Sequence, residues 1–138
     1  MIRYVTAAAL AIVLVACGGN GGYEKATDAQ DAGREFIRAS LDGDYQKAKF
    51  YLLKDDDNLI LLKKQHKNYE GMTSADKHSF SEASIRPIEV TPVNDSVTNY
   101  KYNNSFHPTD TTTIRIVKVN GEWLVDLKSV IKMETLKN

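Results

Sequence analysis

Two kinds of hydrophobic periodicity divide the chain into a helical first part and a strand-forming second part. Between residues 27 and 41, apolar positions recur every three or four residues, which predicts an amphipathic helix. Thr27 and Gln30 have the spacing of a capping box at its start, and Gly43 is expected to end it. The face expected to be buried consists of Ala29, Ala32, Phe36, Ile37 and Leu41.

Two more helices are predicted before the pattern changes. The first is short, is capped by Asp44 and runs to Leu52. The next follows an acidic run that begins at residue 55, within which Asp57 or Asn58 is the expected cap, and it ends at Gly71. The acidic run lacks the alternating ligands of a calcium loop, so we interpret it as a helix start that complements the helix dipole.

From Ser79 onward the apolar positions alternate with a period of two, which predicts strands, and the polar stretch before it, residues 71–79, is expected to be a linker. Asn120-Gly121 separates two alternating runs and suits the two positive-φ positions of a type I′ turn. The resulting register pairs residues whose numbers sum to 241. Its expected pairs include Ile116 with Val125 and Arg115 with Asp126.

A loop at residues 94–96 predicts an earlier hairpin. Pro87 and Pro92 would interrupt the hydrogen-bond ladder of a central strand, so the first strand is predicted to lie at an edge or to be bulged. The expected pairs are Val90 with Tyr100, Glu89 with Lys101 and Ile88 with Tyr102. The predicted fold class is therefore α+β, with three N-terminal helices packed on a curved four-stranded antiparallel sheet.

The beginning of the chain has a different composition. The first sixteen residues include fourteen apolar ones and a single charge, Arg3. The unbroken apolar run from Ala7 to Ala16 suits the h-region of a secretory signal and is shorter than the ~20 residues that span a bilayer. We therefore expect residues 1–16 to be a targeting segment and not part of the folded domain.

Leu14-Val15-Ala16-Cys17 resembles the lipobox of bacterial lipoproteins. The resemblance implies that Cys17 becomes the first residue of the mature chain and carries S-diacylglycerol and an N-acyl group. Several acyl chains hold a protein on a membrane stably, whereas one does so only marginally. The alternative is an ordinary secretory signal that leaves Cys17 as a free thiol. Because Gly18 follows the cysteine in place of the aspartate of the best-known retention rule, the outer membrane of the cell envelope is favoured.

Glycine-rich residues 18–22 are expected to form a flexible tether behind this cysteine. The predicted organisation is a signal peptide at 1–16, the lipidated cysteine and tether at 17–26, a domain at 27–130 and a tail at 131–138. The 18 basic residues balance the 18 acidic ones without clustering, which argues against a nucleic-acid partner. One cysteine and three scattered histidines predict no internal disulfide and no metal site, and no cofactor is expected.

The segments from Phe36 to Leu52 and from Ile116 to Asp126, in the company of a lipobox, resemble cystatin-like, nuclear-transport-factor-like lipoproteins of unknown function. The likeness covers residues 24–130. It implies a cone in which the sheet wraps around a helix and leaves a pocket, and the isomerase and dehydratase members of this superfamily place Asp, His or Tyr in that pocket.

The candidates for a pocket lining are Tyr100, Tyr102, Trp123 and His66, with Phe106 and Tyr69 as further aromatic side chains. Packing in the core is the alternative role for each of them. His78 falls in the expected linker, and His107 and Asp110 in a strand connection. No G-x-S-x-G, H-E-x-x-H or C-x-x-C motif occurs, so no catalytic residue is predicted.

Three functions follow as hypotheses. The preferred one is a non-catalytic envelope lipoprotein, anchored to the membrane at Cys17, that binds a small molecule or a protein partner. The second is a pocket enzyme of the isomerase or dehydratase type. The third is a structural or assembly component that docks partners along an exposed edge strand.

Overall fold

The computed structural model describes residues 22–129. Four helices come first: α1 (Ala29–Asp42), α2 (Tyr45–Phe50), α3 (Asp56–Glu70) and α4 (Ser74–Glu82). They are followed by strands β1 (Ile85–Asn94), β2 (Val97–Asn104), β3 (His107–Val119) and β4 (Glu122–Asp126).

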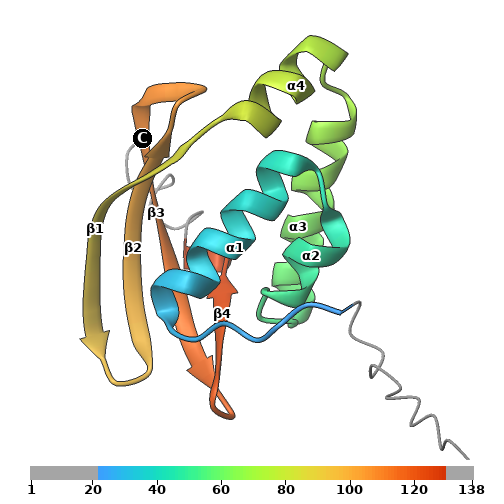
Figure 1. Ribbon diagram of the computed structural model, residues 1–138. Coiled ribbons are helices and arrows are strands. Elements are labelled where there is room, and N and C mark those ends of the chain that lie inside the picture. The colour runs from blue at the N-terminus through green and yellow to red at the C-terminus, as the bar shows by residue number, and fades with distance from the viewer. Residues whose placement is uncertain (1–21, 130–138) are drawn as a thin grey trace, which may run out of the picture.

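The strands form one antiparallel sheet in the order β1-β2-β3-β4, and the helices gather on one face of it (Figure 1). This arrangement confirms the α+β class and the four-stranded sheet. The predicted signal peptide, Cys17 and the C-terminal tail lie outside the described residues.

The prediction of three helices was wrong, because the described part of the chain has four. Helix α4 includes His78 and occupies most of the expected linker, and the first strand begins at Ile85 and not near Ser79. None of the nine residues of α4 is buried, so the helix lacks the apolar stripe on which periodicity depends. Its start is capped by Thr73, whose hydroxyl accepts a hydrogen bond from the backbone N–H of Asp76 at 3.1 Å.

The first helix begins one position later than the predicted capping box. Asp28, not Thr27, is the N-cap, and its carboxylate accepts a hydrogen bond from the backbone N–H of Asp31 at 2.7 Å. The carboxylate of Asp31 in turn accepts one from the backbone N–H of Thr27 at 3.0 Å, so Gln30 has no part in the cap. In a run of polar residues several side chains are able to cap, and spacing alone does not select among them.

The same ambiguity affects α3. Its cap is Asp55, which accepts from the backbone N–H of Asn58 at 2.8 Å, and not Asp57 or Asn58 as predicted. Asn58 is instead fully buried, and its side-chain amide donates to the Asp126 carboxylate at 3.1 Å. This bond ties the start of α3 to the end of β4. The predicted cap of α2 by Asp44 is confirmed.

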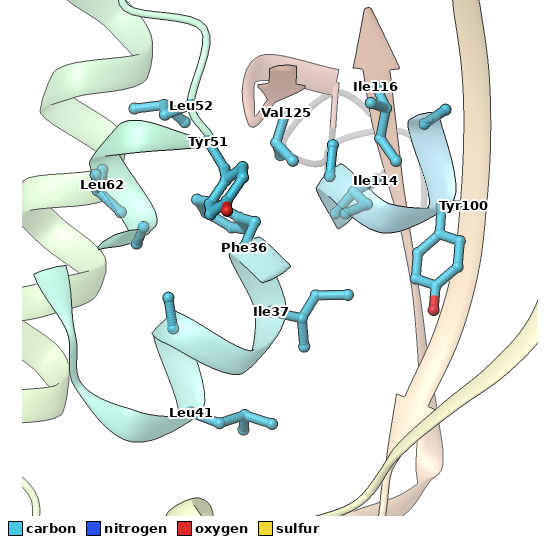
Figure 2. Close-up of a cluster of buried hydrophobic side chains, with 14 of the residues drawn as sticks. Phe36, Ile37, Leu41, Tyr51, Leu52, Leu62, Tyr100, Ile114, Ile116 and Val125 are labelled. Atoms are coloured by element: carbon cyan, nitrogen blue, oxygen red, sulfur yellow. The ribbon is translucent and has the colours of Figure 1, made fainter. Parts of the chain in front are cut away.

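The core forms where α1 crosses the sheet. All five residues of the predicted stripe are buried, from Ala29 to Leu41. Figure 2 shows Tyr100, Ile114 and Ile116 on the sheet, with Phe36 and Ile37 of α1 across from them. Leu52, Leu62 and Val125 extend the same cluster toward α2, α3 and β4.

The hairpin of β3 and β4 has the predicted register. Ile116 lies opposite Val125 and Arg115 opposite Asp126. The turn residues Asn120 and Gly121 have φ values of 52° and 76°, as a type I′ turn requires. The predicted turn and the predicted pairs from Arg115 to Val119 are confirmed.

The hairpin of β1 and β2 differs at one pair. Glu89 and Val90 have their predicted partners, but Tyr102 lies opposite Pro87, and Ile88 falls at a register shift between Pro87 and Glu89. A second irregularity lies between Pro92 and Asn94. Because β1 is an edge strand and is bulged near both prolines, the prediction drawn from the prolines is confirmed.

Residues that precede the predicted start of the domain already contact it, beginning with Tyr23. The Tyr23 ring lies 5.5 Å from the ring of Phe50, and the Tyr51 hydroxyl donates to the backbone carbonyl of Glu24 at 2.7 Å. Tyr23 and Glu24, which were expected in the tether, therefore contact the end of α2 and the residue that follows it.

Gly43 and Gly71 each follow a helix, but only Gly43 has the left-handed backbone conformation, with φ of 71°. The two positions therefore show whether an end of a helix requires glycine. A Cβ at Gly43 would also lie 2.3 Å from the ring of Tyr69, whereas one at Gly71 would have no neighbour closer than 3.6 Å. We expect Gly43→Ala to lower the free energy of unfolding by about 1–2 kcal/mol. Gly71→Ala should leave it unchanged or raise it by up to about 1 kcal/mol. Urea unfolding of both variants is the measurement. An equal loss of unfolding free energy in the two variants would contradict the conclusion that only Gly43 requires glycine.

Candidate functional site

A cavity of about 420 Å³ lies between the helices and the half of the sheet farthest from the β3–β4 turn. On the helical side it is lined by Phe36, Ile37 and Leu41 of α1 and by residues of α3. On the sheet side it is lined by Tyr102 and Ile114, among others. Most of this lining is apolar or aromatic.

The backbone of α1 comes close to the side chains of the sheet at Gly33. A Cβ at Gly33 would lie 2.8 Å from Cδ1 of Ile116 and 3.3 Å from the ring of Tyr100, so the helix backbone rests directly on these side chains. Farther along α1, the side chains of Phe36, Ile37 and Leu41 line the cavity.

Helix α4 and the turn before it contribute Phe80 and Met72 to the lining. Phe80 packs edge-on against Phe106, with ring centroids 4.5 Å apart. The guanidinium of Arg38 on α1 donates hydrogen bonds to the carbonyls of Phe80, Ser81 and Ala83 at 3.2, 2.9 and 2.7 Å. One side chain of α1 thus holds the end of a helix that has no buried residue of its own.

Tyr102 is the cavity residue whose protonation is most strongly affected by its surroundings. Burial, followed by the neighbouring Tyr100, raises the pKa of Tyr102 to about 12. The two rings are stacked, with centroids 5.8 Å apart. At neutral pH the Tyr102 hydroxyl therefore keeps its proton and serves as a neutral hydrogen-bonding group.

The polar part of the lining consists of uncharged groups. They are Ser40, Gln65, Asn68, Asn104 and Thr112, together with the hydroxyls of Tyr69 and Tyr102. Among the described residues, those that line the cavity include no carboxylate, lysine, arginine, histidine or thiol. Such a lining offers hydrogen bonds to a ligand but no group that exchanges protons near neutral pH.

The structure separates the residues proposed from sequence as a pocket lining. Tyr102 and Tyr69 line the cavity, whereas Tyr100, Trp123 and Phe106 do not. Tyr100 is completely buried under α1, its hydroxyl has no partner among the described residues, and burial raises its pKa. Trp123 lies beside the β3–β4 turn, where the Nζ of Lys118 is 5.6 Å from its ring.

His66 lies away from the cavity as well. It lines a small hollow of about 20 Å³ between α1, α2 and α3. Its ring is 4.7 Å from that of Tyr45, and its Nε2 is 3.0 Å from the carboxylate of Glu70. The proposed grouping of His66 with Tyr100, Tyr102 and Trp123 in one pocket therefore does not occur.

Several residues that line the cavity were not predicted from the sequence. Phe36, Ile37 and Leu41 were assigned to the core alone, and Phe80 and Met72 fall in or beside the segment expected to be a linker. Thr112 could have been found, since it is two residues from Ile114 on one strand and so shares its face.

Within residues 22–129, no group of three or more His, Cys, Asp or Glu side chains is arranged to hold a metal ion. No helix in this range is both long enough and apolar enough to cross a membrane.

The chain matches no protein-family model, and no relative is found among curated proteins. One similar solved structure is that of a Campylobacter jejuni protein provisionally named an NTF2-like transpeptidase. It is 15% identical, with a TM-score of 0.48, and the match covers 72% of this chain and 97% of that chain. At this level of similarity, nothing about activity is transferred to the present chain.

The raised pKa of Tyr102 predicts how stability changes at high pH. The native state holds the phenol proton more tightly than the unfolded chain, so this contribution is complete below pH 10 and is lost as the pH rises toward 12. Between pH 10 and 12, we expect the free energy of unfolding of Tyr102→Phe to decline less steeply than that of the unsubstituted protein. Urea midpoints measured across that interval test this, and parallel declines would contradict it.

Proposed function

We propose that this chain is a non-catalytic lipoprotein of the cell envelope, anchored through Cys17, whose cavity binds a small, uncharged and mainly apolar molecule. The observation that carries the proposal is the cavity lining, which joins aromatic and aliphatic side chains to amides and hydroxyls and lacks ionisable acids and bases apart from two phenols. Outer-membrane placement, with the domain outside the cytoplasm, is part of the same proposal.

The dimensions and chemistry of the cavity support ligand binding. Its volume of about 420 Å³ falls within the range of small-molecule sites, which are mostly apolar and contain a few polar groups that orient the ligand. Tyr102 and Thr112 provide hydroxyls on the sheet side, and Asn68 provides an amide from α3. A charged ligand would lose its hydration without meeting an opposite charge, so an uncharged one is favoured.

The same lining disfavours the isomerase or dehydratase alternative. Proton transfer at carbon needs a base whose pKa lies near the working pH. Tyr102, with its pKa near 12, is protonated at neutral pH, and no carboxylate or histidine faces the cavity within the described residues. For this reason we propose binding and not catalysis.

Filling the cavity tests the binding proposal. Thr112 lines the cavity, whereas Thr113 is the next residue on β3 and points to the opposite face of the sheet. We expect Thr112→Phe to abolish the fluorescence gain of the uncharged probe N-phenyl-1-naphthylamine, and Thr113→Phe to retain it. Titration of both folded variants is the measurement. Equal probe binding by the two variants would reject the cavity as the site.

The anchor has its own test in the native envelope. We expect Cys17→Ala to move the protein from the membrane fraction to the soluble fraction and to abolish labelling by an alkyne-bearing fatty acid. The reason is that the thiol and the amine of this residue would carry the acyl chains. Immunoblotting of the fractions, with Thr112→Phe as a matched control that keeps the cysteine, provides the readout. Retention of Cys17→Ala in the membrane fraction would refute the anchor.

A further inference from the structure

The end of the domain at which the described chain begins carries a group of apolar, aromatic and lysine side chains. We name it the hairpin end and define it by Val93, Val119, Lys118, Trp123, Tyr23 and Phe50. We propose that the hairpin end rests on the bilayer that holds the acyl chains of Cys17, with the valines at the level of the lipid headgroups. This inference depends on the proposed anchor and adds to it the orientation of the domain.

The apolar part of this surface lies at the tips of the two hairpins. Val93 precedes the β1–β2 turn and is 57% exposed, and Val119 precedes the β3–β4 turn and is 39% exposed. The two hairpins are joined near their tips, since the backbone N–H of Lys118 donates to the carbonyl of Ser96 at 2.8 Å. Both valines therefore project from a linked, ordered edge of the molecule.

Trp123 and Lys118 adjoin the tip of the β3–β4 hairpin. Trp123 is half-buried, with the Lys118 ammonium near its ring, and Tyr23 is half-buried against Phe50. Rings with one exposed side, next to lysines that extend their charge beyond an apolar stem, suit the boundary between water and lipid.

Lys118 is the one charged residue among the six that define the hairpin end. The acyl anchor therefore provides the affinity for the membrane, and the hairpin end determines only the orientation of the domain.

The length of the tether limits which part of the domain reaches the membrane. Tyr23 follows Cys17 by six residues, which span about 20 Å when fully extended. Tyr51 links this start of the domain to the sheet, because its hydroxyl bonds to Glu24 and its carbonyl accepts from the N–H of Val125, opposite Ile116.

From the level of Ile116, strand β3 extends in two directions. The β3–β4 turn is only a few residues away, at Val119, whereas the other end of β3, at His107, is nine residues and roughly 30 Å distant. Figure 1 shows the hairpin turns at the lower end of the view, with α4 and the β2–β3 connection at the upper end. A tether that reaches at most about 20 Å puts the lower end, and not the upper end, within range of the membrane.

The single tryptophan of the chain makes this orientation measurable. The lipidated full-length protein is reconstituted into vesicles of phosphatidylethanolamine and phosphatidylglycerol, with or without bromine on the acyl chains. We expect bromine to reduce Trp123 emission, and the double variant Val93→Asp, Val119→Asp to show a roughly twofold smaller loss, because two buried charges would lift the tips from the lipid. Ile60→Asp, at the 64% exposed residue of α3, is the matched control and should behave like the unsubstituted protein.

The outcomes separate orientation from anchoring. Co-sedimentation with the vesicles reports the anchor, and its absence would overturn the proposed function. Co-sedimentation without bromine quenching would overturn the orientation alone, as would equal quenching in the double variant. Circular dichroism of the double variant checks its fold, and accessibility of Trp123 in the unsubstituted protein to the aqueous quencher acrylamide gives an independent measure. Acrylamide quenching that does not fall when vesicles are added would also overturn the orientation.

Discussion

The contact of α1 with the centre of the sheet at Gly33 is the constraint on which the rest of the domain depends. No side chain larger than hydrogen fits between the helix and the side chains of Ile116 and Tyr100 without displacing them. The contact holds this turn of α1 against the sheet, and the cavity lies beside the later residues of the helix. Phe36 and Leu41 belong both to the buried cluster and to the wall of the cavity, so the packing of the core and the shape of the site are set by one helix.

The two edge strands of the sheet are protected from pairing with another strand in different ways. The outer edge of β4 is covered by the chain between α2 and α3, where Val125 exchanges backbone hydrogen bonds with Tyr51 and Leu53 at 2.8 and 2.9 Å. Strand β1 is an open edge, but Pro87 and Pro92 and two register shifts interrupt its ladder. Prolines and bulges make an edge a poor template for another strand. The assembly hypothesis, which uses this edge for docking, therefore has little physical support in β1.

The parts of the fold that could be predicted are those determined by residues close together in the sequence. An Asn-Gly turn sets the register of β3 and β4 by itself, and the stripe of α1 reports one buried face. Helix α4 was missed because its stability comes from outside it, through Arg38 and the contact of Phe80 with Phe106. The spacing of Thr73 and Asp76, which resembles a capping box, was the available sequence signal. Ile88 was paired wrongly because alternation carries no information about a bulge.

The lining of the cavity was also only partly predictable from the sequence. The place of the cavity in the domain determines the side from which a ligand enters. Alternation placed Tyr100 and Tyr102 on one face of β2, but it does not reveal that α1 packs on Tyr100 at Gly33 while Tyr102 lines the cavity. Because Tyr102 and Phe80 lie toward the α4 end, the cavity is remote from the hairpin end. If the hairpin end rests on the bilayer, a ligand does not enter directly from the lipid. The wall of the cavity at the α4 end includes Phe80 of α4, the helix whose last carbonyls accept hydrogen bonds from Arg38.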